Sequence, residues 1–173
     1  MPIPLLARPS GVGAEAVVLD RWGRVLLQLR LWPLGWEPPG GHVAPGEDPA
    51  RTVVRETREE TGLEIEVQRL CGRYRFRGLR QDWDLVFRAQ VVGGRPRRTR
   101  EAVRIRWFLP DRLPRSIFPW YRQRIQDALA DPEGPAPDRI QYVGLGTVLG
   151  HGRAILQDLV RWPGRTSSPR ASP

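Results

Sequence analysis

The alternation of apolar and polar residues predicts a β-hairpin near the start of the chain. Apolar segments at 14–19 and 24–30 flank residues 20–23 (Asp-Arg-Trp-Gly), a sequence typical of a tight turn. The following segment, 31–41, is rich in Trp, Pro and Gly and keeps neither a helical nor a strand period. We therefore expect an ordered loop there that brings backbone atoms to a site.

A helix is predicted for residues 49–61. Asp48 is a good N-cap, Pro49 suits the first helical position, and Gly62 suits the C-terminal end. Apolar side chains recur at intervals of three and four residues, so one face of this helix should pack on a sheet. The residues of that face are Ala50, Val53, Val54 and Thr57.

Beyond this helix the pattern predicts more strands and a second helix. The strands are expected at 63–68, 73–76, 83–92 and 103–109, with a turn at Gly93-Gly94. The second helix should cover residues 119–130. Together these elements predict a mixed α/β fold.

The length of 173 residues suits one domain with a short C-terminal extension. We assign 1–131 to the domain and 132–138 to a Pro-rich linker. Apolar residues at helical spacing predict a helix within the extension, 139–162, and the composition of 163–173 is that of a disordered tail. The last helix either caps the domain or makes an oligomer contact, as in a homodimer, and the sequence leaves both open.

Composition narrows the class of protein. Hydrophobic residues make up 40% of the chain and charged residues 27%, as in a soluble globular protein. No apolar run approaches the roughly 18 residues that span a bilayer, and no secretion signal is evident, so we expect a cytoplasmic protein without a membrane partner. Cys71 is the only cysteine, which excludes an internal disulfide and a cysteine-based zinc site, and we expect it in the core.

The net charge of +9 suits a phosphate-bearing ligand. All 28 basic residues are Arg, however, and together with 18 Pro and 18 Gly this usage is typical of GC-rich coding. The charge by itself is therefore weak support for a nucleic-acid partner.

The predicted first helix carries three glutamates on one face. Glu56, Glu59 and Glu60 are spaced at i, i+3 and i+4, and each pair of like charges costs about 0.2–0.5 kcal/mol on an exposed helix. A divalent cation would offset this repulsion, and carboxylate oxygens suit Mg²⁺ or Mn²⁺. Arg55 precedes Glu59 by four residues and is expected to hold that carboxylate, and also Glu47, in a fixed position.

These residues belong to a longer motif. Starting at Gly41, the chain has five residues, Glu47, seven residues, Arg55-Glu56, two residues, Glu59-Glu60, one residue, and Gly62-Leu63. This spacing resembles the Nudix box, GX5EX7REUXEEXGU, where U is aliphatic, at every invariant letter. The one departure is Thr57, at a position that is usually aliphatic.

The resemblance implies a Nudix hydrolase, with an α/β/α sandwich around a mixed β-sheet. It implies that Mg²⁺ or Mn²⁺ is held by Glu56, Glu59 and Glu60 and by a loop carbonyl near Gly40, and that a pyrophosphate linkage is cleaved. The substrate would be a nucleoside triphosphate or a nucleoside diphosphate linked to another moiety. The general base is expected to be Glu56 or, as second choice, Glu101.

Residues that select the substrate are less evident in the sequence. Arg30 ends the strand that leads into the loop and could hold a phosphate, and Trp36 could stack on a base. Gly41 should allow the backbone to approach substrate phosphates closely. Trp32 and Trp83 are further aromatic candidates, although aromatic residues at such positions more often belong to the core.

Two functions other than hydrolysis of a small molecule are considered. A Nudix-fold binding or regulatory module typically loses box glutamates, and this chain retains all four. An RNA 5′-end pyrophosphohydrolase would use Arg-rich segments such as 95–100 to track phosphates. The favoured interpretation of these segments is that they carry solvent-exposed arginines that result from GC-rich coding. Nucleic acid is therefore the less favoured partner. Of the two histidines, we expect His42 on a strand beside the site and His151 at the surface.

Overall fold

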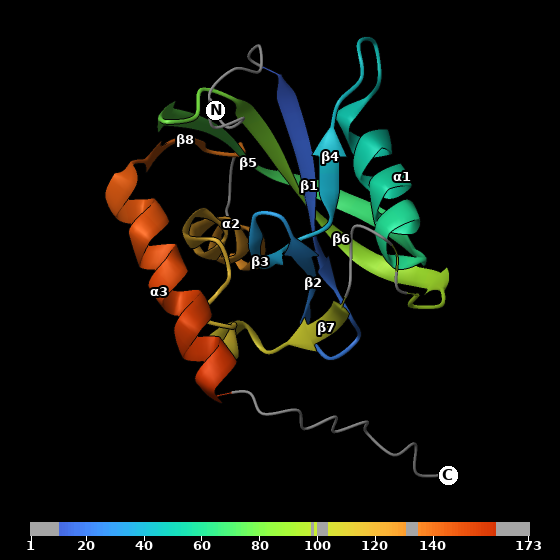
Figure 1. The fold of residues 1–173 in the computed structure, drawn as a ribbon. Helices are drawn as coiled ribbons and strands as arrows, with labels where there is room; N and C mark the ends of the chain where they lie inside the picture. The colour runs from blue at the N-terminus through green and yellow to red at the C-terminus, as the bar shows by residue number, and fades with distance from the viewer. Residues whose placement is uncertain (1–10, 98, 100–103, 131–134, 162–173) are drawn as a thin grey trace, which may run out of the picture.

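A twisted β-sheet with helices on both sides forms the fold (Figure 1). The computed structural model describes residues 11–97, 99, 104–130 and 135–161. The strands are β1 (Val12–Leu19), β2 (Val25–Leu31), β3 (Leu34–Glu37), β4 (Gly40–His42), β5 (Leu63–Gly78), β6 (Trp83–Gly94), β7 (Arg104–Phe108) and β8 (Asp138–Val143). In the described residues their order is β3-β2-β1-β6-β5-β8, with β4 beside β1 and β7 beside β2. The pairs β1–β6 and β5–β8 are parallel, so the sheet is mixed.

The predicted hairpin is confirmed, but the loop predicted after it is not. β1 and β2 meet at the Leu19–Val25 pair, and the Arg24 amide donates a hydrogen bond to the Asp20 carboxylate at 2.9 Å within the turn. Residues 31–41, however, contain β3, which pairs with β2, and the first two residues of β4, which pairs with β1. These strands are stabilised by hydrogen bonds to the neighbouring strands. Their own sequence is rich in Pro and Gly and lacks an alternating apolar pattern, which is why it suggested a loop.

The first helix, α1 (Pro49–Thr61), has the predicted bounds and caps. The Asp48 side chain accepts a hydrogen bond from the Ala50 amide, and Gly62 ends the helix with a φ of 77°, in the left-handed region that favours glycine.

The face of α1 that packs on the sheet differs in part from the prediction. Val53 and Thr57 are fully buried, whereas Val54 remains 36% exposed. The other buried positions of the helix are polar, and they are Thr52, Glu60 and Thr61. The face of α1 that packs on the sheet therefore includes Glu60, whose carboxylate is buried.

The later strands are longer than predicted. The segments 63–68 and 73–76 belong to one strand, β5, whose pairing with β6 is interrupted by bulges that divide its apolar pattern. Gly93-Gly94 ends β6 instead of forming a turn, since Gly94 pairs with Leu63. The second predicted helix is confirmed as α2 (Pro119–Leu129), which follows a short 3₁₀ turn, η1 (Pro110–Arg112).

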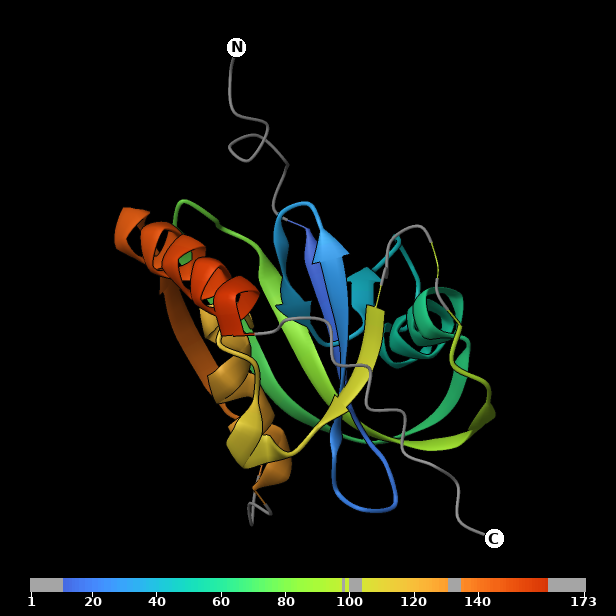
Figure 2. The same ribbon diagram turned by 60° about the horizontal axis from the view of Figure 1, so that its bottom comes forward.

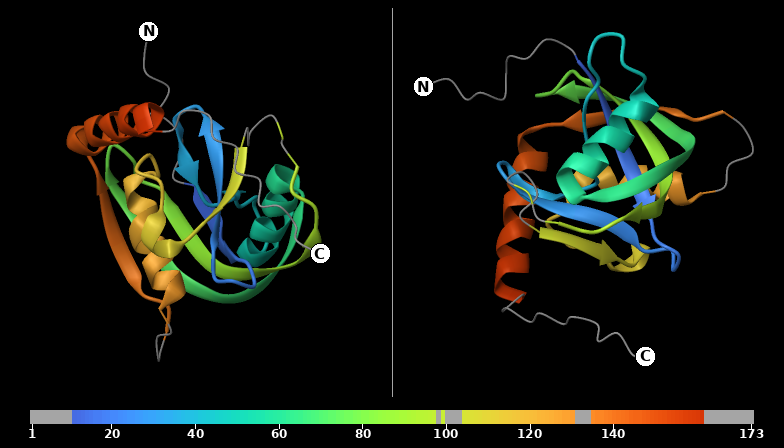
Figure 3. Two further views of the ribbon diagram at one scale, coloured as in Figure 1. Left: turned by 90° about the horizontal axis from the view of Figure 1, so that it is seen from below. Right: turned by 90° about the vertical axis from the view of Figure 1, so that its right-hand side faces the viewer.

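The C-terminal extension joins the fold. β8 begins at Asp138, the last residue of the predicted linker, and lies beside β5, and α3 (Leu145–Arg161) follows it. Figure 2 and Figure 3 show α1 on one side of the sheet and α2 and α3 on the other. The division of the chain into domain, linker and extension stays a prediction, and the tail expected at 163–173 lies outside the described residues.

The core has two parts, one on each face of the sheet. β1 alternates between them, because Ala14, Ala16 and Val18 belong to the α1 side while Val17 and Leu19 belong to the α2 side. In the part of the chain that the structure describes, no helix has both the length and the hydropathy needed to cross a bilayer.

Candidate active site

The carboxylates of α1 point in different directions. Glu60 is 7% exposed and accepts a hydrogen bond from the Gly40 amide at 3.0 Å. Glu56 lies against Gly41, because a Cβ on Gly41 would come within 2.5 Å of the Glu56 carboxylate carbon. The Glu59 side chain is 60% exposed. The site is therefore formed where α1 meets the backbone of β4, with Glu59 at its edge.

Close packing requires both glycines of β4. Gly40 pairs with Glu15 and Gly41 with Ala14 in the neighbouring strand β1. A Cβ on Gly40 would lie 2.3 Å from the Ala14 carbonyl oxygen, which no side chain tolerates. The glycines thus allow the β4 backbone to contact the Glu56 and Glu60 carboxylates directly.

Arg55 contacts three glutamates at once. Its Nε and Nη2 donate to the two oxygens of Glu47 at 3.0 and 3.2 Å. Its Nη1 donates to Glu56 at 2.7 Å and to Glu59 at 3.4 Å. Hydrogen bonds from Arg55 lower the pKa of Glu47 to about 2. The planar guanidinium holds these carboxylates in a defined geometry, which the single ammonium of Lys could not reproduce.

Glu60 lies in a buried and acidic environment. Burial, together with the negative charges of Glu37 and Glu56, raises the pKa of Glu60 to about 8, although hydrogen bonds from Gln28 and Gly40 oppose the shift. Gln28 itself is 1% exposed, and its Oε1 has no partner in the described residues. A cation close to Glu60 would favour its ionised form.

The residues present fit a metal ion that is bound partly by water and phosphate. Within the described residues, no three acidic, His or Cys side chains could hold an ion by themselves. The Glu59 side chain is 60% exposed and pairs with Arg55, and the role of Glu56, Glu59 and Glu60 together as metal ligands stays a prediction. Glu56, Glu60 and the β4 backbone offer oxygen donors only. Mg²⁺ commonly uses one or two carboxylates, several waters and substrate phosphates, so this donor set suits it.

Two predicted substrate contacts are already engaged within the protein. Arg30 donates a hydrogen bond to Glu37 at 3.2 Å. Trp36 is 6% exposed and meets Phe108 edge-on at a centroid distance of 5.1 Å. Trp36 is therefore a core residue, and its ring is not available to stack on a base.

The remaining candidates are placed as follows. Trp32 is 80% exposed beside β3, and Trp83 is 37% exposed with the Arg75 guanidinium 5.2 Å from its ring centroid. His42 lies on β4, as expected. Glu101, the second candidate for the general base, lies outside the described residues. Cys71 is fully buried, as predicted.

An ionic network on the other face of the sheet was not predicted. Arg124 of α2 is fully buried and donates to Glu15 at 2.7 Å and to Asp84 at 2.8 Å. It also donates to Gln141 of β8 at 2.9 and 3.0 Å. Because Glu15 lies opposite Gly40, this network supports the strand beneath the site. One sequence signal could have indicated this network. Glu15 is a charged residue within the apolar run of β1, and the two-residue alternation of a strand places its side chain on a buried face.

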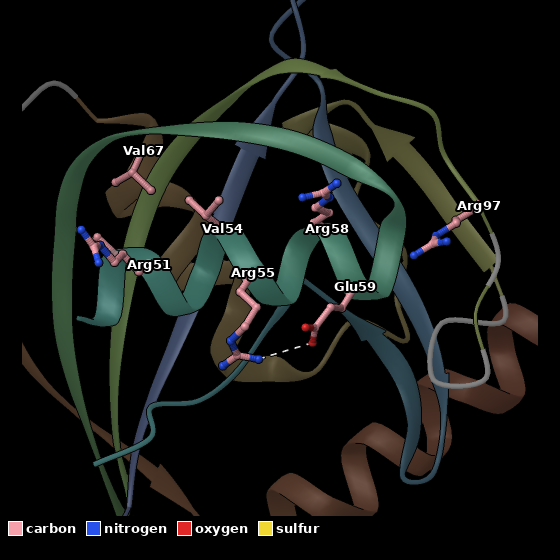
Figure 4. Close-up of a pocket in the computed structure, with 8 residues that line it drawn as sticks. Arg51, Val54, Arg55, Arg58, Glu59, Val67 and Arg97 are labelled. Atoms are coloured by element: carbon pink, nitrogen blue, oxygen red, sulfur yellow. Dashed lines mark hydrogen bonds and ion pairs between the residues drawn. The ribbon is translucent and has the colours of Figure 1, made fainter. Parts of the chain in front are cut away.

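A pocket of about 640 Å³ lies on the outer side of α1. Its lining residues are Ala50, Arg51, Val54, Arg55, Arg58, Glu59, Val67 and Arg97. Figure 4 shows Val54 and Arg58 on the same side of the helix, with Val67 above Val54, and Arg55 and Glu59 on the other side of the helix. No salt bridge within the described residues involves Arg51, Arg58 or Arg97. The pocket therefore presents positive charge beside the glutamate site.

The site thus consists of a capped helix that holds carboxylates against a glycine backbone, with an arginine that fixes them. Residues 9–128 match the NUDIX domain family. A "MutT-like protein" of Streptomyces ambofaciens is 37% identical over 126 residues, which cover 72% of this chain and 79% of that protein. A "Putative 8-oxo-dGTP diphosphatase" of Bacillus subtilis strain 168 is 34% identical over 116 residues, which cover 66% and 77%.

A solved structure agrees with these relatives. The "MutT NUDIX hydrolase" from Burkholderia pseudomallei is 28% identical, with a TM-score of 0.61 over 69% of this chain and 98% of that one. The chain belongs to the NUDIX family, which confirms the expected α/β/α sandwich and the pyrophosphohydrolase class.

Proposed function

We propose that this protein is a Mg²⁺-dependent pyrophosphohydrolase of nucleoside triphosphates, with Mn²⁺ able to replace Mg²⁺. One observation carries the proposal: α1 holds Glu56 and Glu60 against the glycine backbone of β4, and Arg55 fixes Glu56 in place. The name of the Bacillus subtilis relative supports a triphosphate over a nucleoside diphosphate linked to another moiety.

The reaction adds water across a phosphate anhydride. The water oxygen bonds to phosphorus, the bridging P–O bond breaks, and a nucleoside monophosphate and pyrophosphate leave. Bound Mg²⁺ would neutralise charge on the phosphate oxygens and acidify the attacking water. Glu56 accepts the proton that this water loses, and Arg55 keeps the Glu56 carboxylate oriented. Gly40 and Gly41 allow the β4 backbone to approach the Glu60 and Glu56 carboxylates closely.

The test is a substrate screen with the purified full-length chain. Nucleoside triphosphates, including oxidised ones, should release pyrophosphate in Mg²⁺ or Mn²⁺, and excess EDTA should abolish the release. ADP-ribose, dinucleotides and sugar nucleotides should be turned over more slowly. Binding of a nucleotide with no turnover at any metal concentration would contradict the proposal and support a non-catalytic Nudix-fold binding module instead.

An RNA 5′-end pyrophosphohydrolase is a second candidate, favoured by the arginine pocket of α1. Arg51 lies in the first turn of the helix, where the helix dipole disfavours a cation and no acidic residue is present. Arg58 and Arg97 lie farther along the same pocket, so the charges form a row rather than a single point (Figure 4). A row of this kind suits successive phosphates of a strand.

The two candidates can be separated by a variant. Replacing Arg51, Arg58 and Arg97 together with Gln should raise the KM for 5′-triphosphate RNA by tenfold or more, roughly the effect of losing three phosphate contacts. The KM for a free nucleoside triphosphate should stay within about twofold. Equal KM changes for both substrates, or none for RNA, would remove the RNA candidate.

A further inference from the structure

The C-terminal helix α3 lies beyond the part of the chain that matches the NUDIX family, yet it contacts the strand that leads into the site. The match ends at residue 128, whereas α3 covers Leu145–Arg161. The His151 ring stacks on Phe118 with a centroid distance of 4.4 Å, and its Nε2 lies 2.8 Å from the Leu34 carbonyl oxygen. Because a carbonyl only accepts hydrogen bonds, Nε2 carries the proton of this pair. His151 is thus a packing residue and not the surface residue that we expected.

β3 also needs a glycine where it meets α3. A Cβ on Gly35 would lie 2.8 Å from the Nε2 atom of His151 and 2.9 Å from the Phe118 ring. α3 and Phe118, the residue just before α2, therefore press directly on the β3 backbone at this point.

A second contact lies two helical turns farther along α3. Asp158 follows His151 by seven residues, which places both on one face of the helix. Its Oδ2 accepts hydrogen bonds from the Ser116 amide at 2.7 Å and from the Ser116 hydroxyl at 2.5 Å. The Ser116 carbonyl in turn accepts a hydrogen bond from the Trp36 amide at 2.9 Å, and the Phe118 amide donates to the Trp36 carbonyl at 3.1 Å. β3 is thus held between β2 and a segment that is anchored on α3.

Only three residues separate Trp36 from Gly40 at the site. Two of them are Pro38 and Pro39, whose φ angles are restricted by their rings. The Pro39 carbonyl accepts a hydrogen bond from the Ala16 amide at 2.9 Å, which fixes the end of this connection on β1. The connection between Trp36 and Gly40 is therefore short and conformationally restricted.

The attachment of α3 depends on these polar contacts more than on apolar burial. Six large apolar side chains of the helix are between 51% and 82% exposed, and they are Leu145, Val148, Leu149, Leu156, Leu159 and Val160. Few apolar groups would thus retain the helix if its hydrogen bonds to Leu34 and Ser116 were removed.

We propose that α3 positions the active-site backbone, with Asp158 and His151 as positioning residues that act through β3. This inference rests on the proposed function, because the geometry being positioned is that of Gly40 and Gly41 against Glu60 and Glu56. Glu56 and Glu60 belong to α1, on the other side of the sheet from α3 (Figure 3), so the loss of these contacts displaces the β4 backbone rather than the helix that carries the carboxylates.

The test compares Asp158→Ala with Gln157→Ala in the full-length chain. Gln157 is the matched control, because it accepts a hydrogen bond from the Arg115 side chain at 2.9 Å and, within the described residues, makes no hydrogen bond to the 116–118 backbone. Asp158→Ala should raise the KM for the best nucleotide substrate about tenfold with kcat within about threefold, in line with the loss of hydrogen bonds to a charged group. Gln157→Ala should leave both unchanged.

Hydrogen exchange supplies a readout that does not need activity. In Asp158→Ala, the amides of Trp36 and Gly40 should exchange at least about tenfold faster, while the amides of α1 keep their protection. His151→Phe, which keeps the stacked ring and removes the hydrogen bond to Leu34, should give a smaller change of the same kind. If Asp158→Ala unfolds, Asp158→Asn, which retains the size and one acceptor, takes its place.

The outcomes are distinct. Unchanged exchange at Trp36 and Gly40, or faster exchange spread evenly over the whole chain, would overturn the positioning role. If no nucleotide is turned over by the wild type, the proposed function fails, while the exchange measurement still decides whether α3 holds β3.

Discussion

The two faces of the β-sheet are constructed in different ways. On the α1 face, the functional groups from Gly41 to Leu63 lie within one short stretch of sequence, and Arg55 contacts glutamates no more than eight residues away. On the α2 face, Arg124 binds partners that are 17, 40 and 109 residues distant in the chain. The comparison shows that the candidate catalytic residues come from one short segment of the chain, whereas the residues that support this segment from the other face are joined by long-range contacts.

The difference also predicts how each face responds to substitution. Arg55, Glu47 and Glu59 at the α1 site remain partly accessible to water, so replacing one of them should alter activity more than stability. The charges around Arg124 are buried, so replacing one should alter stability first.

The largest effect is expected for Glu60→Gln. The amide oxygen of Gln can still accept the hydrogen bond from Gly40, so the fold should persist while the charge is lost. We expect kcat to fall by at least about a hundredfold, as for the loss of a group that stabilises a charged transition state. Steady-state kinetics and a thermal melt measure the two quantities. Glu64→Gln, an exposed position on β5, is the control, and undiminished activity of Glu60→Gln would refute the metal-site assignment.

The next largest effect is expected for Arg124→Met, on the opposite face. The substitution leaves Glu15 and Asp84 buried without their cation and should lower the free energy of unfolding by about 3–5 kcal/mol. Urea denaturation provides the measurement. Arg112→Met, at an exposed arginine, should change the free energy of unfolding by less than about 1 kcal/mol. Similar decreases in the free energy of unfolding of the two variants would mean that the buried network around Arg124 does not contribute more to stability than an exposed arginine does.

An intermediate effect is expected for Arg55→Lys. Lys retains the positive charge but cannot donate to Glu47 and Glu56 with a planar fork. We expect kcat/KM to drop about tenfold, and the free energy of unfolding to change by less than about 1 kcal/mol, because the side chain is partly exposed. Full activity in the Lys variant would contradict the orienting role of Arg55 and indicate that its side chain acts only as a surface charge.

The smallest effect concerns the pH dependence of Glu47. Its pKa is lowered from 4.5 to about 2 by hydrogen bonds from Arg55, so ionisation of Glu47 stabilises the folded state. This stabilisation is complete above pH 4.5 and is lost as the pH falls toward 2. The melting temperature of Glu47→Gln should therefore lie below that of the wild type at pH 7, and the gap should narrow at pH 3. A gap that widens on acidification would contradict the sign of this linkage.

Sequence patterns predicted α1 accurately because its determinants are local. Asp48 and Gly62 cap the helix, and Arg55 lies four residues from Glu59, as the spacing requires. The Nudix box indicated the family for the same reason, since its letters are confined to one loop and one helix. Periodicity failed at Val54, because the sheet contacts the helix on the side of Glu60.

Long-range contacts limited the prediction elsewhere. β3 and β4 exist as strands because β2 and β1 pair with them, and no short window of sequence contains both partners. Trp36 was a substrate candidate because its ring could stack on a base, but the ring packs on Phe108, which is 72 residues later in the chain.

By itself, the sequence determined the helix α1, its caps, its glutamates and the arginine that orients them, because helical geometry depends on residues within one or two turns. Only the tertiary structure decided which carboxylates face β4, that Arg124 is buried beneath the site, and that α3 is attached to β3. These features depend on backbone and side-chain partners up to 117 residues apart, whose proximity is created by folding of the whole sheet.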